Sequence, residues 1–457
     1  MIMLSKFSVQ NFYSINEQVT LNFNFSNSKA HAFKQNVIFQ YNGPTKRSIL
    51  NGGIIFGANA SGKTNLLEAL KFLKAHIDNS YKFDEKEDIM LELKPFKFAK
   101  DNSTRFKIEF ILENVEGYHN DDLYTNMKHN SNIKKNYIIN YELFLNNKDL
   151  SVQYENLRYS EIMKTKVGKE KILFERKHDE VTDNASEINE IRKKVEKDNI
   201  TFKSLLSLVI NDVNKNYFKE EIETFEYKLM SEIHDKCFKN IHFNQRNASD
   251  EFMQEINKNK DYRKYVLRNL KKFDFAIKDI EVEDITADLL ESVNNSDTPE
   301  KIKEMLIESI KSEKRYTTYA LHFVNEQKYR MPLSEESRGT QKFLNHSYSM
   351  YEALLEDGLF VVDEFESAYH HRIQEGIVNN FINQSGKAQF LIVSHNSLLL
   401  NKNLFSKEQI IFLEKDREKE STVLKHLSEY KDVTYNNHNW LNLYYQGRLG
   451  AVPEVVF

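Results

Sequence analysis

The chain has 457 residues, 40% of them hydrophobic, which is enough for one large domain or two smaller ones with a substantial core. Its 64 basic and 68 acidic residues give a formal net charge of −4, so any nucleic-acid-binding surface must be local. No segment approaches the roughly 18 apolar residues of a membrane-spanning helix, and the first residues lack a signal-peptide pattern. Because Cys237 has no second cysteine to pair with, we expect a soluble protein of the reducing cytoplasm.

The first informative segment is an apolar run at residues 53–56, followed by Gly57-Ala58-Asn59-Ala60-Ser61-Gly62-Lys63-Thr64 and by the helix-forming residues 65–70. This spacing predicts a strand, a phosphate-binding loop and a helix, with successive backbone N–H groups pointing at the phosphates of a nucleotide. We expect Lys63 to reach the β and γ phosphates, Thr64 to ligate Mg²⁺, and the helix end near Gly62 to add positive potential. The alternative is a Gly/Ser turn that caps an ordinary helix, which the flanking strand and helix disfavour.

The next segments predict a side sheet and then an irregular helical region. Residues 105–112 and 137–145 are rich in β-branched and aromatic residues and predict strands, whereas the polar residues 114–136 predict a mobile loop. From about residue 180 to 315 the sequence is charged and has no strict heptads, so it predicts helices but no long coiled-coil arm.

Within the helical region, a basic stripe is predicted on one helix face. Lys260, Lys264, Arg268 and Lys272 recur at i, i+4 spacing. Such a stripe contacts phosphates in some proteins, but it fits equally well against solvent or the acidic run from Asp279 to Glu291. We favour the second interpretation.

The second half of the chain supplies acids and a histidine at the ends of apolar runs. Residues 358–362 are a short apolar run that predicts a buried parallel strand, and it ends in Asp363 and Glu364. We expect Asp363 to hold Mg²⁺ and Glu364 to act as general base for the attacking water. The alternative is an acidic strand end that only caps the next helix.

A second apolar run, at residues 389–393, ends in Ser394-His395-Asn396 and predicts another buried strand. His395 is a candidate to polarise the γ-phosphate, although a lone histidine is more often structural. The adjacent His370 and His371 do not indicate a zinc site, because neighbouring side chains point apart and no Cys/His set surrounds them. Glu414 and Asp416, which follow the run at residues 410–413, look structural.

Before these strands, Ser337-Arg338-Gly339-Thr340 precedes a helical pattern that continues to Leu355. A Ser-x-Gly turn at a helix start offers a hydroxyl and N–H donors to an anion, but taken alone it is only a good helix cap.

Taken together, this order of motifs resembles the ABC-type ATPase heads of SMC-like and OLD-like proteins. The resemblance is strongest to stand-alone AAA-type ATPases of the OLD-like class in bacterial anti-phage systems, such as AbiL-like abortive-infection ATPases and the ATPase subunit of PARIS. Further matching stretches are residues 7–14, Asn59 and Asn65 around the loop, Pro95-Phe96, and residues 445–453 near the end. The match covers both ends of the chain and not its middle.

The resemblance implies that Ser337 and Gly339 form a signature that contacts the γ-phosphate bound to the opposite subunit, so that two heads enclose two ATP molecules. The sequence departs from the family pattern at Tyr13, where an arginine is usual, at the large Arg338 in the signature, and at His371, where a proline is common. These departures bear on the turnover rate more than on ATP binding.

We therefore predict an α/β fold, a P-loop ABC-type ATPase head with a mixed sheet and a helical insertion. The predicted domains are a first head lobe at residues 1–175, the insertion at 176–315 and a second head lobe at 316–457. The predicted catalytic residues are Glu364, His395 and Lys63, and the predicted metal ligands for Mg²⁺ are Thr64 and Asp363. The residues predicted to bind ATP are Gly57, Asn59, Ser61, Gly62, Lys63, Thr64, Asn65, Ser337 and Gly339.

The functional hypothesis is an Mg²⁺-dependent ATPase that senses infection and controls a separately encoded effector, for which a TOPRIM nuclease is one candidate. It follows from an absence: OLD-type nucleases carry a TOPRIM acid cluster after the head, whereas only about 60 residues follow His395 here. The expected partners are a second copy of the chain and the effector, with no membrane. The alternative is an SMC-like DNA-repair or recombination ATPase that binds DNA.

Overall fold

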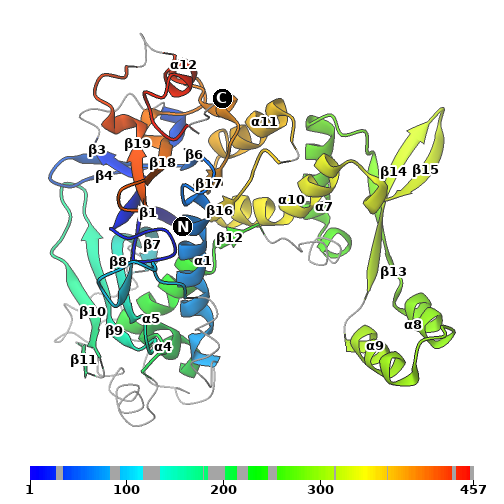
Figure 1. Cartoon of the computed structure of the whole chain (residues 1–457), viewed down its shortest axis with the longest axis horizontal. Helices are drawn as coiled ribbons and strands as arrows, with labels where there is room; N and C mark the ends of the chain where they lie inside the picture. The colour runs from blue at the N-terminus through cyan, green and yellow to red at the C-terminus, as the bar shows by residue number, and fades with distance from the viewer. Residues whose placement is uncertain are drawn as a thin grey trace, which may run out of the picture. The chain divides into compact units, whose positions relative to one another are not determined.

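The computed structural model describes residues 1–26, 34–82, 93–116, 134–178, 180–183, 201–213, 225–244, 255–312, 315–367, 369–434 and 439–452. These residues form two compact units, coloured along the chain in Figure 1. Unit 1 comprises Met1–Phe243, Ala353–Glu366 and Ile377–Phe457, and unit 2 comprises Asn244–Glu352 and Ser367–Gly376. The units therefore divide the chain at other points than the predicted boundaries: residues 176–243 cluster with unit 1 and residues 316–352 with unit 2.

A six-stranded mixed sheet forms the centre of unit 1. Its order is β12 (Ile241–Phe243), β16 (Leu359–Val362), β17 (Gln389–Val393), β6 (Gly52–Gly57), β18 (Ile410–Asp416) and β19 (Ser421–His426). All neighbours are parallel except β18 and β19, which form an antiparallel hairpin. Because parallel strands end at the same edge, the residues that follow β6, β16 and β17 meet there.

A seven-stranded antiparallel sheet forms the other large layer of unit 1. Its order is β11 (Glu180–Asp183), β10 (Lys171–Lys177), β9 (Val152–Ile162), β8 (Lys134–Asn146), β7 (Ser103–Glu116), β1 (Ile2–Gln10) and β2 (Val19–Asn22). A small sheet of β3 (Asn24–Ser26), β5 (Lys46–Leu50) and β4 (Val37–Asn42) accompanies it. Unit 1 also contains α1 (Lys63–Asn79), α4 (Leu205–Val213), α5 (Phe225–Glu232), α12 (Trp440–Tyr445), the π-helix η3 (Ile233–Phe238) and the short helices η1 (Lys34–Asn36), η2 (Ser80–Lys82), η5 (Ser397–Leu399), η6 (Lys407–Gln409) and η7 (Leu427–Glu429).

Side-chain alternation places α1 on one face of the mixed sheet. Ile55, Val361 and Leu391 point to this face and join one core with Leu66 and Leu70 of α1 and with the antiparallel sheet. The intervening residues on the same strands point to the opposite face, because successive side chains in a strand alternate. They make aromatic contacts there, pairing Phe360 with Phe381 of α11 (His371–Ile382) and Phe56 with Tyr444 of α12. The helix that follows the phosphate-binding motif is therefore held between both large sheets.

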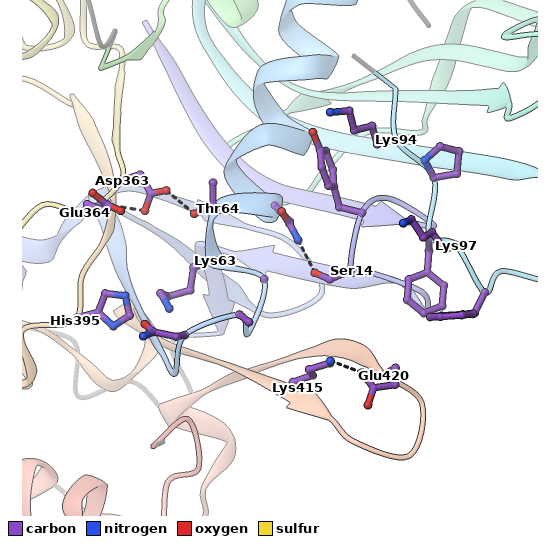
Figure 2. Close-up of a pocket in the computed structure, with 18 residues that line it drawn as sticks. Ser14, Lys63, Thr64, Lys94, Lys97, Asp363, Glu364, His395, Lys415 and Glu420 are labelled. Carbon is purple, nitrogen blue, oxygen red and sulfur yellow. Dashed lines mark hydrogen bonds and ion pairs between the residues drawn. The ribbon is translucent and has the colours of Figure 1, made fainter. Parts of the chain in front are cut away.

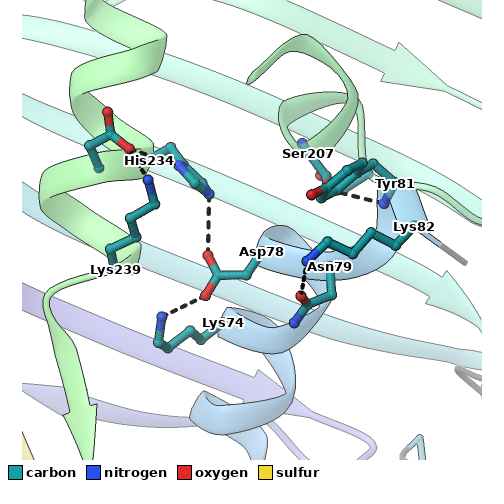
Figure 3. A network of polar contacts seen from close by, with 10 residues as sticks. Lys74, Asp78, Asn79, Tyr81, Lys82, Ser207, His234 and Lys239 are labelled. Carbon is teal, nitrogen blue, oxygen red and sulfur yellow. Dashed lines mark hydrogen bonds and ion pairs between the residues drawn. The ribbon is translucent and has the colours of Figure 1, made fainter. Parts of the chain in front are cut away.

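A polar network fixes the C-terminal half of α1 to the π-helix η3, as Figure 3 shows. Lys74 Nζ lies 2.5 Å from Asp78 Oδ2, and His234 Nε2 lies 3.2 Å from Asp78 Oδ1. Burial alone would raise the pKa of Asp78, but the contacts with His234 and Lys74 outweigh it and lower the pKa. A charged carboxylate thus ties the two helices together.

Unit 2 combines a small sheet with helices. It contains α7 (Lys260–Lys272), β13 (Asp279–Asp284), α8 (Thr286–Asn294), α9 (Glu300–Ser312), β14 (Tyr316–Val324), β15 (Gln327–Pro332), η4 (Leu333–Glu335) and the start of α10 (Arg338–Glu356). The sheet order is β13-β14-β15, antiparallel throughout. The sequence predicted helices from 180 to 315, but this region also contains the strands β11, β12 and β13. The acidic run begins with the alternating strand pattern of β13.

Three acids of this strand, Asp279, Glu281 and Glu283, pair with basic residues outside the stripe. Glu281 contacts Lys328 and Arg330 on β15, and Asp279 lies 2.5 Å from Arg263, which is not a stripe residue.

The predicted fold class is confirmed: both mixed and antiparallel sheets are present with helices against them. The strands predicted at 105–112 and 137–145 are β7 and β8. Most of the predicted loop at 114–136 lies outside the described residues. No helix in the described ranges is long and apolar enough to cross a membrane.

Candidate nucleotide-binding site

Strand β6 leads directly through the loop at residues 58–62 into α1, as the motif predicts. Gly57 has no room for a side chain, since a Cβ there would lie 2.5 Å from the Leu413 carbonyl oxygen and 2.5 Å from Ser61 Oγ. Gly62 has a φ of 98°, in the left-handed region that glycine tolerates best, and Ala60 also has a positive φ of 62°. The tight turn therefore depends on glycine at its beginning and end.

Lys63 is the first residue of α1, and only 6% of it is exposed. Its Nζ donates to the carbonyl oxygens of Gly57, at 2.9 Å, and Ala58, at 2.8 Å. Burial lowers the pKa of Lys63, while Asp363 and Glu366 oppose that shift. The ammonium group thus lies inside the loop, where an anionic ligand would replace its carbonyl partners.

The next residue of α1 contacts the end of β16, as Figure 2 shows. Thr64 Oγ1 donates to Asp363 Oδ2 at 2.6 Å, although the residues are 299 positions apart. The other carboxylate oxygen, Oδ1, accepts from the backbone N–H of Glu364 at 2.9 Å. Glu364 itself is exposed at the edge of the site, and its φ of 48° shows that the backbone leaves the extended strand conformation there. A hydroxyl and a carboxylate are the hard oxygen ligands that suit Mg²⁺, so Thr64 and Asp363 fit this ion.

His395 follows β17 at the same edge of the sheet and is exposed. The residue before it is anchored: Ser394 Oγ donates to Glu366 Oε2 at 2.7 Å, and the Ser394 N–H donates to the Ile55 carbonyl at 3.0 Å. The strand tip that carries His395 is therefore fixed to β6.

These residues line one pocket of about 760 Å³ within unit 1. Of the predicted residues it brings together Asn59, Gly62, Lys63, Thr64, Asn65, Asp363, Glu364 and His395. Gly57 and Ser61 are buried and do not line the pocket.

The pocket is also lined by residues that the sequence analysis did not assign to the site. They are Tyr13, Ser14, Ala60, Lys94, Pro95, Phe96, Lys97, Phe98, Lys415 and Glu420. Lys94 Nζ lies 5.6 Å from the centre of the Tyr13 ring, and Phe98, with 73% of its surface exposed, packs edge-on to Phe96. The departure at Tyr13 and the Pro95-Phe96 stretch were signals in the sequence, but neither indicated a shared pocket.

Ser337 and Gly339 lie in unit 2, where Ser337 caps α10. Its Oγ accepts from the Thr340 N–H at 3.1 Å and lies 2.8 Å from Thr340 Oγ1. The predicted helix start is therefore present. Glu414 packs against the backbone of Gly450, and Asp416 accepts from the backbone N–H groups of Glu418 and Lys419, which are structural contacts.

Comparison with known protein families gives a match over residues 54–401 to the family described as "AAA domain, putative AbiEii toxin, Type IV TA system". The chain belongs to this AAA-domain family. The match begins in β6 and ends after His395, so it includes the pocket residues that follow β6, β16 and β17. The pocket residues Tyr13, Ser14, Lys415 and Glu420 lie outside it. None of the curated proteins compared with the chain matches it.

Solved structures similar to the chain include SMC head domains. An SMC head bound to the C-winged helix domain of ScpA is 11% identical, with 94% of this chain and 100% of that chain covered and a TM-score of 0.39. The SMC head domain from Thermotoga maritima is 11% identical, with 93% of this chain and 98% of that chain covered and a TM-score of 0.36. The Pyrococcus furiosus SMC head with an extended coiled coil, bound to the C-terminal domain of ScpA, is 12% identical. The comparison covers 94% of this chain and 98% of that chain, with a TM-score of 0.37.

Proposed function

We propose that unit 1 binds ATP with Mg²⁺ in this pocket and hydrolyses it to ADP and phosphate. The observation that carries the proposal is the 2.6 Å hydrogen bond between Thr64 and Asp363, which joins the phosphate loop to the acidic end of β16. If the turn only capped a helix, no contact with an acid at the end of a strand 299 residues away would be expected. A hydroxyl and a carboxylate placed side by side in this way would hold Mg²⁺, which would neutralise phosphate charge.

The chain's own residues divide the chemistry among them. The loop N–H groups and Lys63 hold the β and γ phosphates, and Thr64 and Asp363 hold Mg²⁺, which supplies neutralisation of phosphate charge when bound. Glu364 accepts a proton from water while the water oxygen attacks the γ-phosphorus, and the bond to the bridging oxygen breaks to release ADP. His395, at the tip of β17, donates a hydrogen bond to the γ-phosphate.

The opposite end of the pocket suits the nucleobase. Tyr13 and Phe98 offer aromatic surface beside the buried Phe96. Lys94 and Lys97 offer positive charge at the rim. Stacking of a base on the exposed ring of Phe98 would be the most favourable of these contacts, because it would remove the apolar surface of the ring from water.

We further propose that two copies act together, with Ser337 and Gly339 of one copy contacting the γ-phosphate held by the other. The position of Ser337 and Gly339 at the start of α10 supports this, since a helix start presents N–H donors and positive potential to an anion.

In the cell, we propose, the ATPase is cytoplasmic and belongs to the OLD-like class, senses infection and controls a separately encoded effector, with a TOPRIM nuclease as one candidate. The supporting observations are the family description, which names a toxin of a type IV toxin–antitoxin system, and the resemblance of the motif set to abortive-infection ATPases.

Phosphate release from the purified full chain tests the chemical step. We expect Glu364→Gln to bind ATP as the wild type does but to lose about 10²- to 10⁴-fold in turnover, because only the proton acceptor is removed. Lys71→Ala is the matched control: this lysine is on the same helix, and 58% of its side chain is exposed. Equal turnover in Glu364→Gln and wild type would remove Glu364 as the base.

The biological role is tested by phage plating. Cells that carry the native gene neighbourhood should be protected, and Lys63→Ala should abolish the protection while leaving protein levels unchanged. If neither version protects against a varied phage panel, the defence role is wrong.

One observation favours the DNA-binding alternative: Lys260, Lys264, Arg268 and Lys272 are all exposed along α7. Lys264 is 3.1 Å from Asp261, but both side chains are more than three-quarters exposed, so that pair neutralises little. If this surface binds DNA, binding falls steeply with salt and falls further when Lys264 and Arg268 are changed to glutamate.

A further inference from the structure

Beneath the phosphate loop lies a chain of hydrogen bonds between distant segments of unit 1. Asn65 Nδ2 on α1 donates to Ser14 Oγ at 2.7 Å. Ser14 Oγ lies 2.7 Å from Thr422 Oγ1 on β19, although these residues are 408 positions apart. Thr422 Oγ1 in turn donates to the carbonyl oxygen of Ser61, inside the loop, at 3.0 Å.

The direction of these hydrogen bonds follows from the number of hydrogens that each hydroxyl carries. Each hydroxyl has one hydrogen to donate. Since Thr422 donates its hydrogen to Ser61, it must accept in the contact with Ser14, and Ser14 must be the donor there. The hydrogen bonds therefore run one way, from Asn65 through Ser14 and Thr422 to the loop carbonyl.

The loop backbone rests directly on this hydroxyl pair. A Cβ on Gly62 would lie 2.1 Å from Thr422 Oγ1 and 2.7 Å from Ser14 Oγ, so only glycine fits against this pair. Thr422 and Ser61 are almost completely buried, and the Thr422 backbone N–H donates to the Ser14 carbonyl at 2.8 Å. Because water cannot replace a lost partner here, the Ser61 carbonyl depends on the threonine hydroxyl.

We propose that Thr422 is a positioning residue for the phosphate loop. Its hydroxyl holds the Ser61–Gly62 peptide from the side opposite the phosphates, so that the loop N–H groups are preset for the nucleotide. This inference rests on the proposed function, and it adds a residue from the β18–β19 hairpin that the nucleotide does not touch. The hairpin also carries Lys415 and Glu420 to the pocket wall, so one element sets both the loop and the rim.

The structure offers a matched control for this hydroxyl pair. Thr20 on β2 makes the same kind of contact, with its Oγ1 2.8 Å from Ser8 Oγ, away from the loop. Thr20→Val and Thr422→Val each remove one threonine hydroxyl and keep the side-chain shape, but only the second removes support from the loop.

The test measures ATP dissociation constants in Mg²⁺ by calorimetry, KM and kcat for hydrolysis, and the thermal midpoint, all on the full chain. We expect Thr422→Val to raise the dissociation constant and KM by about 10-fold, the value of one buried hydrogen bond, with a smaller change in kcat. Thr422→Ser should restore both, because the hydroxyl is kept, and Thr20→Val should leave both unchanged.

Ser14→Ala provides a second variant should Thr422→Val not fold. It removes the donor to Thr422 but keeps the bond to Ser61, so we expect a rise in the dissociation constant of about 3-fold, smaller than for Thr422→Val. The proposal is overturned if Thr422→Val or Ser14→Ala binds ATP like wild type, or if Thr422→Ser binds as weakly as Thr422→Val. It is also overturned if Thr20→Val weakens binding equally, since the effect would then be general. If the wild type itself binds no ATP, the proposed function fails first.

Discussion

Replacing His76 by leucine should make the fold less sensitive to acid. His76 lies on α1, is 2% exposed, and stacks on Phe72 with ring centres 5.8 Å apart. Neither ring nitrogen has a hydrogen-bond partner among the described residues. Burial, with a smaller effect of Arg176, lowers the pKa of His76 from 6.5 to about 3.

The magnitude follows from proton linkage. Between pH 6.5 and about 3 the unfolded chain binds a proton at His76 that the folded chain does not, so stability is full above pH 6.5 and falls as the pH falls. At pH 5.0 this single histidine should cost about 2 kcal/mol relative to pH 7.5. Burial lowers the pKa of His242 to about 4 and that of His346 to about 3. These two histidines contribute equally to the pH dependence of stability in wild type and in His76→Leu.

Urea unfolding at pH 7.5 and 5.0 measures the effect. The free energy of unfolding of wild type should drop between the two pH values by about 2 kcal/mol more than that of His76→Leu. His370→Leu, which removes an exposed ring, is the control and should behave like wild type. Equal drops in wild type and His76→Leu would refute the conclusion that His76 is buried and neutral.

Further predictions concern other buried contacts. Glu155→Gln should lower the free energy of unfolding by about 2 to 4 kcal/mol in urea titrations, because this buried carboxylate accepts from Tyr141 Oη at 2.8 Å and from the Leu205 N–H at 2.7 Å; an unchanged midpoint would contradict it. Gly52→Ala should lower the thermal midpoint far more than Gly447→Ala: both have positive φ, but only a Cβ at Gly52 would lie 1.9 Å from the Phe390 carbonyl oxygen. Asp363→Asn should reduce the gain in ATP affinity on adding Mg²⁺ by about 10-fold or more, measured with and without chelator, and an undiminished gain would show that Asp363 does not hold the ion.

The parts of the site that sequence predicted are those with local patterns. The spacing from Gly57 to Thr64 specifies a turn within a few residues, and the apolar runs before Asp363 and His395 specify buried strands whose ends meet at one sheet edge. Parallel pairing of β16, β17 and β6 then brings these groups together without further information.

The rest of the site depends on long-range packing that no local pattern contains. Thr422 reaches the loop because β18 lies beside β6 in the sheet and β19 pairs with β18 at the sheet edge. Nothing in the sequence distinguishes Phe98 from the other aromatic residues. Only the structure shows that it is exposed and lines the pocket. β13 was missed for a different reason: its acidic residues alternate with Ile280 and Val282, and the charge masked the strand period.

The most direct test of the central claim is calorimetric titration of ATP with Mg²⁺ into the full-length chain, comparing wild type, Lys63→Ala and Lys71→Ala. Wild type and Lys71→Ala should bind with dissociation constants of about 1 μM to 1 mM, and Lys63→Ala about 100-fold more weakly, because the only change is loss of a buried cation in the phosphate loop. Absence of binding by wild type, or equal binding by wild type and Lys63→Ala, would contradict an ATP site in this pocket.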